Sequence, residues 1–198
     1  MTPKLIAVCG GIGAGKSTVT RLLRIMGYPV YDCDSQAKRL MEESEPVKQQ
    51  LIDLFGPTAY DGNHLNRQLI ASQVFNDKSL LNKLNSIVHP AVKSDIIHWA
   101  HNNQEDELLF VETAILKESN LEQLFDNIIY VTAPIDIRIR RVMKRSNLTH
   151  SQVMERINNQ DSTIPQNAAI IINDDTNSII AQTLQILIDN TDKHSHST

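Results

Sequence analysis

One short stretch of the sequence has the residue types and spacing of a phosphate-binding loop. Gly10–Ser17 reads GGIGAGKS and matches the pattern GxxxxGK[ST]. It lies directly between an apolar segment and a helical pattern, which is the context that the motif requires. Glycines let successive backbone N–H groups turn toward an anion, and the start of the helix adds partial positive charge. We therefore predict a site for the phosphates of a nucleoside triphosphate.

The side chains of this loop have separate predicted roles. Lys16 can reach the outer phosphates, and the hydroxyl of Ser17 can bind Mg²⁺. A glycine-rich turn without a ligand is the alternative, and the flanking strand and helix patterns argue against it. The residues that we expect to contact the nucleotide here are Gly11, Gly13, Ala14, Gly15, Lys16, Ser17 and Thr18.

Two carboxylates follow the second apolar segment, in VYDCDSQAKRL. Asp32 and Asp34 would share one face of a strand that continued through both. The carboxyl end of a strand is where open α/β sheets bind ligands. An aspartate there can accept the proton of an attacking hydroxyl, or hold that hydroxyl in line with the γ-phosphate. The alternative is that one of the two acids caps the helix that follows.

A run of basic residues, DIRIRRVMKR, lies late in the chain. Arg138, Arg141 and Arg145 share one face of a helix, at spacings of three and four residues. Positioned positive charge stabilises a transferring phosphoryl group, so we expect Arg141 and Arg145 to take part in catalysis. Arg138 and Arg140 are interpreted as members of a solvated basic face.

Short apolar segments alternate with helical patterns along the chain. The apolar segments are rich in Val and Ile and mostly continuous, as expected for parallel strands covered on both faces. This order predicts a three-layer α/β fold with a five-stranded parallel sheet. The predicted strands are Leu5–Cys9, Pro29–Cys33, Glu107–Glu112, Ile128–Thr132 and Ala169–Asn173, and the helices between them include Lys16–Met26, Asp136–Arg145 and Ser151–Asn159.

The segment between the second and third predicted strands is much longer than the dozen or so residues that a crossover needs. It contains no convincing strand, and we interpret it as an inserted helical lobe at the ligand-binding edge of the sheet. Mere decoration of the fold is the alternative. His89 precedes Pro90, which predicts a turn between two helices there. The helices expected in the lobe are Val47–Phe55, Leu65–Phe75, Asp77–Val88 and Pro90–Asn102.

We predict a single phosphate-loop kinase domain over residues 1–190 and a disordered polar tail over residues 191–198. The parts of this domain are a core of about 1–45 and 106–190 and a helical insertion of about 46–105.

Composition narrows the partners of the protein. The chain has 198 residues and a formal net charge of −4, so it lacks the positive field typical of nucleic-acid binding. It has no apolar run long enough to span a membrane. Its two cysteines form no CxxC pair, which favours a reduced, cytoplasmic compartment. The oligomeric state stays open.

Other classes of phosphate-loop protein fit less well than a small-molecule kinase. A switch GTPase needs an NKxD segment, but the NK at Asn82–Lys83 is misplaced and lacks the aspartate. The DxxG match at Asp53–Gly56 lies within a helical pattern and is interpreted as chance. At 198 residues there is little room for the machinery of a motor ATPase. A kinase of another nucleoside, nucleotide or sugar, and a nucleotide-binding regulatory protein with a vacant Asp34 site, stay open as alternatives.

The sequence as a whole resembles a known family, dephospho-coenzyme A kinase. The likeness runs from about residue 4 to residue 188 and rests on six segments in the family's order. Each segment beyond the phosphate loop is weak alone, and the six together are specific. They are GGIGAGKSTV, YDCDSQAKRL, LNRQLIASQVF, LNSIVHPAV, the lid segments Arg141–Arg145 and Arg156–Gln160, and AIIIND.

The resemblance implies a reaction and roles for individual residues. It also implies that the insertion of about 46–105 binds the acceptor and that residues of about 138–165 form a helical lid. ATP, with Mg²⁺, would phosphorylate the ribose 3′-hydroxyl of dephospho-coenzyme A to give coenzyme A and ADP, the last step of coenzyme A biosynthesis. Asp34 would be the catalytic carboxylate, acting with Lys16 and Arg141. Further ATP contacts would come from Arg145 and from Asn173 near the adenine, and further acceptor contacts from Arg67 and His89.

The chain departs from the family pattern at two places. After the third predicted strand, Ala114 and Lys117 replace a proline and an apolar residue. Glu112 keeps a carboxylate where contact with Mg²⁺ or its water is expected. The glycine that follows the late asparagine in the family is Asp175 here, so we expect the loop on the adenine side to differ in shape.

Overall fold

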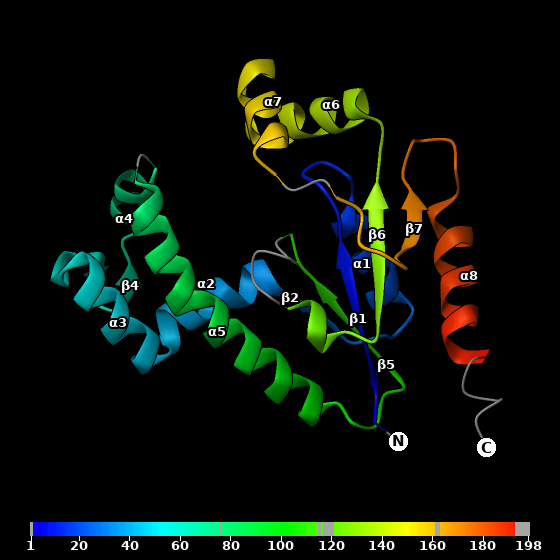
Figure 1. Cartoon of the computed structure of the whole chain (residues 1–198), viewed down its shortest axis with the longest axis horizontal. Helices are drawn as coiled ribbons and strands as arrows, with labels where there is room; N and C mark the ends of the chain where they lie inside the picture. The colour runs from blue at the N-terminus through cyan, green and yellow to red at the C-terminus, as the bar shows by residue number, and fades with distance from the viewer. Residues whose placement is uncertain (1, 76, 115, 117–120, 161–162, 193–198) are drawn as a thin grey trace. The chain divides into compact units, whose positions relative to one another are not determined.

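The computed structural model of the protein describes residues 2–75, 77–114, 116, 121–160 and 163–192 (Figure 1). The chain divides into two compact units. We call them the core unit, made of Met1–Val30 and Asn103–Thr198, and the helical unit, Tyr31–Asn102. Lys117 and residues 193–198 of the predicted tail lie outside the described residues. Residues 191 and 192, which we expected in the disordered tail, instead end helix α8 (Ile179–Asp192). Among the described helices, none combines the length and apolar character needed to cross a bilayer.

A five-stranded sheet runs in the order β2-β5-β1-β6-β7. β1 pairs in parallel with β5 and with β6, and β6 pairs in parallel with β7. The predicted three-layer α/β fold with its five-stranded parallel sheet is confirmed, with strand ends shifted by at most one residue. The strands are β1 Lys4–Cys9, β2 Val30–Asp32, β5 Leu108–Glu112, β6 Asn127–Thr132 and β7 Ala169–Ile172.

The core of this unit forms where helices cover the central strands. α1 (Lys16–Ile25) and α8 (Ile179–Asp192) contribute to one buried cluster with the strands. Phe110 at the centre of β5 is fully buried, and Tyr28 packs edge-on against it. Continuous apolar strands such as β1 are explained by this burial, because both of their faces are covered.

Two further helices follow β6 and share a small core of their own. α6 (Ile135–Ser146) and α7 (His150–Asn158) pack through Ile139, Val142, Val153 and Ile157. In Figure 1 they lie beyond the end of β6. A capping box formed by Thr149 and Gln152 starts α7, as the sequence predicts.

The described residues of the helical unit form four α-helices and a small hairpin. Their apolar faces meet in a cluster that includes Val47, Leu51, Phe55 and Ile70. The elements are α2 Cys33–Glu43, α3 Glu45–Phe55, α4 Arg67–Val74, α5 Lys78–Asn102, β3 Tyr60–Asp61 and β4 His64–Leu65; the 3₁₀ turns are η1 Pro57–Ala59 and, in the core unit, η2 Glu122–Leu124.

Two expectations for this unit are wrong. The lobe contains the antiparallel hairpin of β3 and β4, which turns at Gly62 with a φ of 59°. Asp-Gly at this point is a hairpin signal, but strands of two residues are too short to show alternation. In addition, α5 continues through His89 and Pro90 without the predicted turn. A stripe of Val88, Val92 and Ile96 is buried across the proline, and this packing outweighs the local cost of Pro90.

Candidate active site

The phosphate loop connects the end of β1 to the start of α1, and its glycines are required by close contacts. Gly13 and Gly15 have φ values of 78° and 100°. A Cβ atom on Gly13 would lie 2.6 Å from the Arg138 carbonyl oxygen. A Cβ atom on Gly15 would lie 2.0 Å from Asn173 Nδ2. Larger residues are therefore excluded both by backbone conformation and by the neighbouring chain.

Three side chains from distant parts of the core unit hold the backbone of this loop. The Ile12 N–H donates to Gln160 Oε1 at 2.7 Å, and Arg138 Nε donates to the Ile12 carbonyl at 2.9 Å. Asn173 Nδ2 donates to the Ala14 carbonyl at 2.9 Å, and Asn173 is buried. Hydrogen bonds at the backbone N–H and carbonyl of Ile12 and at the carbonyl of Ala14 therefore fix the shape of the loop.

The interpretation of Arg138 as a residue of a solvated basic face is wrong. Its side chain is half-buried against the phosphate loop, and this burial lowers the pKa of its guanidinium. The helical spacing shared with Arg141 and Arg145 was a usable signal, because it placed Arg138 on the same face as two site candidates. Arg140 is exposed, as expected.

The reactive side chains of the loop lie at its end. Lys16 Nζ donates to the Gly10 carbonyl at 2.8 Å, so the ammonium group folds back across the loop. Ser17 and Thr18 are exposed in the first turn of α1. Their position at a helix N-terminus suits the binding of an anion.

Glu112 and Cys9 end the neighbouring strands β5 and β1, close to the phosphate loop in the sequence or the sheet. The Thr20 hydroxyl, which is buried in α1, donates to Glu112 Oε2 at 2.5 Å. Cys9 ends β1, and burial raises the pKa of its thiol to about 11, although Lys16 lowers it in part. Cys9 is therefore protonated at neutral pH and packs as a small core residue.

The two candidate lid arginines differ in their surroundings. Arg141 donates to Asn173 and to Asp175, in the loop that follows β7. Arg145 is exposed in the last turn of α6. The structure thus places Arg141, and not Arg145, beside a residue that also contacts the phosphate loop.

In the helical unit, the two acids near the start of α2 have different roles. β2 ends at Asp32, so the expectation that Asp32 and Asp34 share a strand face is wrong. Asp32 Oδ1 accepts hydrogen bonds from the backbone N–H groups of Asp34 and Ser35, at 3.0 and 3.1 Å. This cap pulls the chain into the helix directly after the strand. Asp34 lies exposed in the first turn of α2.

The two predicted acceptor residues lie on different helices of this unit. Arg67 begins α4, is exposed, and pairs with Glu42 at 2.9 Å. His89 is half-buried within α5. Their proposed contacts with an acceptor stay predictions.

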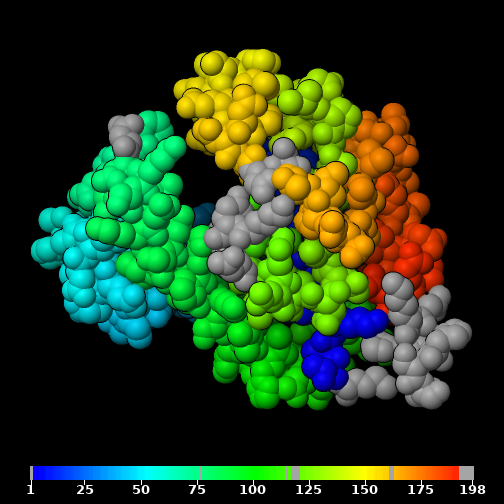
Figure 2. Space-filling view, in the orientation of Figure 1, coloured from blue at the N-terminus to red at the C-terminus, as the bar shows by residue number. Residues whose placement is uncertain are grey.

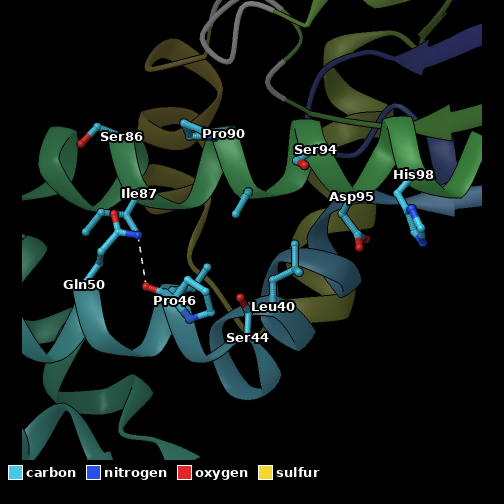
Figure 3. A pocket seen from close by; sticks show the side chains of 12 residues that line it. Leu40, Ser44, Pro46, Gln50, Ser86, Ile87, Pro90, Ser94, Asp95 and His98 are labelled. Carbon is cyan, nitrogen blue, oxygen red and sulfur yellow. Dashed lines mark hydrogen bonds between the residues drawn. The ribbon is translucent and has the colours of Figure 1, made fainter.

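A cavity of about 570 Å³ lies in the helical unit, between α5 and the junction of α2 and α3 (Figure 3). Its wall is mixed, with aliphatic side chains beside hydroxyl, amide, carboxylate and imidazole groups. Figure 3 shows Gln50 bound through Nε2 to the Pro46 carbonyl, at 3.1 Å. The residues that line the cavity are Leu40, Ser44, Pro46, Val47, Gln50, Ser86, Ile87, Pro90, Ala91, Ser94, Asp95 and His98. Neither Arg67 nor His89 is among them.

One wall residue of the cavity, Asp95, belongs to a charged cluster that sequence reasoning missed. The Tyr31 hydroxyl donates to Asp95 Oδ2 at 2.6 Å, and Arg39 Nη2 lies 2.9 and 2.8 Å from the two carboxylate oxygens. Burial and the neighbouring carboxylate strongly raise the pKa of Tyr31. The Tyr31 ring also packs on Trp99, with centroids 5.4 Å apart. No local sequence pattern predicts the ion pair between Arg39 on α2 and Asp95 on α5.

The described residues contain no cluster of three or more His, Cys, Asp or Glu side chains that could hold a metal ion. His98 and His101 are both exposed on α5.

Comparison with known proteins gives one consistent result. The family model for dephospho-CoA kinase matches residues 4–179. The dephospho-CoA kinase of Bacteroides fragilis is 34% identical over 185 residues, covering 92% of this chain and 90% of that protein. The enzyme of Porphyromonas gingivalis is 40% identical over 156 residues, covering 79% of this chain and 77% of that protein.

Solved structures agree with the fold. A crystal structure from Thermus thermophilus superposes with a TM-score of 0.81 at 34% identity, covering 96% of this chain and 98% of the other. The match to the family model spans residues 4–179, nearly the whole chain, and includes the phosphate loop. The chain therefore belongs to the dephospho-CoA kinase family.

Proposed function

We propose that this protein transfers the γ-phosphoryl group of ATP to the ribose 3′-hydroxyl of dephospho-coenzyme A, giving coenzyme A and ADP. The observation that carries this proposal is a phosphate loop whose backbone is bound by the side chains of Arg138, Gln160 and Asn173, in a chain of this family. A loop fixed in advance binds the triphosphate without a cost of ordering.

In the proposed step, Asp34 accepts the proton of the 3′-hydroxyl or holds that hydroxyl in line. The hydroxyl oxygen forms a bond to the γ-phosphorus while the bond from that phosphorus to the β–γ bridging oxygen breaks, and ADP leaves. Lys16 stabilises the negative charge on the phosphates, together with Arg141 and Arg145. Exposure of Asp34 at the start of α2 supports this role, since a carboxylate turned inward into a cap, as in Asp32, could not perform it.

We assign Mg²⁺ binding to the exposed hydroxyl of Ser17 together with the nucleotide itself. Mg²⁺ commonly keeps several waters and is held by few protein ligands plus substrate phosphates. Glu112, oriented by Thr20, is proposed to contact a water of that ion. When bound, the ion neutralises charge on the β- and γ-phosphates.

We assign the acceptor to the helical unit, with Arg67 and His89 as candidate contacts. The cavity between α2, α3 and α5 has room for an extended chain, and its alternation of aliphatic and polar groups suits the amide-containing arm of dephospho-coenzyme A. We place the reaction in the cytoplasm, because the composition favours reduced cysteines.

The test is a panel of acceptors with the purified protein. ADP release is measured with dephospho-coenzyme A, shikimate, gluconate, thymidylate and adenylate as acceptors. We expect turnover that depends on dephospho-coenzyme A and exceeds that with the others. Turnover with a different acceptor alone would reassign the kinase, and ATP binding without turnover on any acceptor would favour a regulatory protein.

A further inference from the structure

The loop that follows β7 contains an aspartate in a conformation that favours glycine. Asp175 has a φ of 67°, in the left-handed region that Asp and Asn tolerate better than most side chains. The preceding residue builds the turn, because Asp174 Oδ1 accepts from the backbone N–H groups of Thr176 and Asn177 at 3.0 and 2.9 Å. The turn therefore does not depend on the Asp175 carboxylate, which forms contacts outside it.

Those contacts are with arginines of α6. Arg141 Nη2 lies 2.6 Å from Asp175 Oδ1, and Arg140 Nη2 lies 3.2 Å from Asp175 Oδ2. The two arginines differ in exposure, since the side chain of Arg140 is 68% exposed and that of Arg141 is 29% exposed. Asp175 thus pairs with one solvated arginine and with one that is largely buried.

Arg141 also binds the residue that supports the phosphate loop. Its Nη2 donates to Asn173 Oδ1 at 3.0 Å, and its Nη1 donates to the Asn173 carbonyl at 3.2 Å. Asn173 in turn donates to the Ala14 carbonyl. The guanidinium therefore has three acceptor oxygens on one loop and is connected through Asn173 to the backbone of the phosphate loop.

We propose that Asp175 is a positioning residue, which holds the side chain of Arg141 against Asn173 so that Arg141, from α6, binds the nucleotide beside the loop after β7. Exposed ion pairs contribute little to stability, so the effect of Asp175 will be found in nucleotide affinity. Arg145, exposed one turn further along α6, is then the arginine free to approach the transferring phosphoryl group. This inference rests on the proposed use of ATP, and it does not depend on the acceptor.

The experiment measures binding of ADP and of a non-hydrolysable ATP analogue by calorimetry in the presence of Mg²⁺. Asp175→Asn removes the charge and keeps a residue that tolerates positive φ, while Asp175→Gly removes the side chain and relaxes the backbone. We expect both variants to bind about 3- to 10-fold more weakly, with thermal stability maintained. In an Arg141→Ala background, Asp175→Asn should change the affinity by less than about twofold, because the partner is absent.

Arg140→Gln is the matched control, because it removes the solvated partner of Asp175 and should leave affinity within about twofold of wild type. Affinity in Asp175→Asn equal to or tighter than wild type would overturn the proposal, as would a loss that persists in full without Arg141. Nucleotide binding needs no acceptor. A failure of turnover with dephospho-coenzyme A would therefore reject the proposed function, while the nucleotide affinities would still test the role of Asp175.

Discussion

The phosphate loop and the wall of the helical unit's cavity are both held by side chains from distant segments, but they are held in different ways. At the loop, side chains bind backbone groups, as Gln160 and Arg138 bind Ile12. At the cavity, side chains bind each other, as Tyr31 and Arg39 bind Asp95. The first arrangement fixes the path of a loop that must fit a ligand, whereas the second ties two helices together. Substitutions at the loop should therefore change nucleotide binding, and substitutions at the cavity wall should change stability first.

The largest effect should come from Gly15→Ala. The added methyl group meets Asn173 Nδ2 at 2.0 Å on a backbone with positive φ, so the loop and Asn173 must both move. We expect ATP affinity to fall by a factor of at least ~100, since several phosphate contacts are displaced together. Calorimetric titration with nucleotide measures the loss.

Gly27→Ala is the matched control, because it separates the effect of the positive φ from the effect of the clash with Asn173. Gly27 also has a positive φ, of 92°, but an added Cβ would have no neighbour within 4 Å. It should destabilise the protein by about 1 kcal/mol through backbone strain and leave ATP affinity unchanged. Equal loss of binding in both variants would refute the importance of the contact between Gly15 and Asn173.

Asp34→Asn tests whether Asp34 acts in catalysis while Asp32 only caps α2. We expect turnover to fall by at least ~10² while nucleotide affinity stays close to wild type, because a lost proton acceptor affects the chemical step. Asp32→Asn is the matched control, since asparagine also caps helices and should retain turnover within a few-fold. Steady-state kinetics compare the two, and similar activity in Asp34→Asn and wild type would contradict the catalytic role.

Arg138→Ala probes support of the loop by a residue that is not expected to touch the acceptor. The substitution removes a charged donor from the half-buried Ile12 carbonyl, a contact that contributes about 1.5–3 kcal/mol in proteins. We expect ATP to bind about 10-fold more weakly. Arg140→Ala, on the solvated face, should bind ATP normally, and a loss as large as that of Arg138→Ala would remove the distinction between the two residues.

A smaller effect, on stability alone, is expected for Tyr31→Phe in the helical unit. It removes one hydrogen bond to the Asp95 carboxylate, whereas Tyr60→Phe removes one to the Met41 carbonyl, and both are 2.6 Å long. Bonds to charged groups contribute more, so we expect losses of about 2 and about 1 kcal/mol in the free energy of unfolding. Denaturant titration gives both values. A reversed order would show that Arg39 alone satisfies Asp95.

The smallest effect concerns pH. Burial raises the pKa of Cys9 from its ordinary 9.0 to about 11, so the folded state holds this proton more tightly than the unfolded state. The resulting stability is fully present below pH 9 and is lost as the pH rises toward 11. Cys9→Ala should show a shallower decline of unfolding free energy across this interval. An identical slope in both proteins would contradict the shifted pKa.

The sequence predicts most of what is local in this molecule. The five strands and the phosphate loop follow from apolar runs and from a motif whose residues are adjacent, and the cap at Thr149 follows from a spacing of three residues. The strand ends differ from the predicted ones by at most one residue. β2 stops at Asp32 because a side-chain cap competes with the next extended residue, and a pattern of alternate residues cannot detect that competition.

The contacts that complete the candidate site are long-range, and for that reason they were missed. Arg138 lies 126 residues from Ile12, and Asp95 lies 56 residues from Arg39. Helical spacing groups Arg138 with Arg141, but it cannot say that one faces the phosphate loop and the other the loop after β7. At Pro90 a local signal gave a wrong prediction. The proline predicts a turn between two helices, but buried residues on both sides of it keep α5 continuous.

The central claim is that the triphosphate in the phosphate loop gives its γ-phosphoryl group to the ribose 3′-hydroxyl of dephospho-coenzyme A. The most direct test incubates the protein with ATP carrying ¹⁸O in the γ-phosphate and with dephospho-coenzyme A, then determines the mass and position of the label in the products. We predict coenzyme A with the labelled phosphate at the 3′-oxygen, formed in a ratio of one to one with ADP. Label found only in free phosphate, or at another position of the acceptor, would contradict the account.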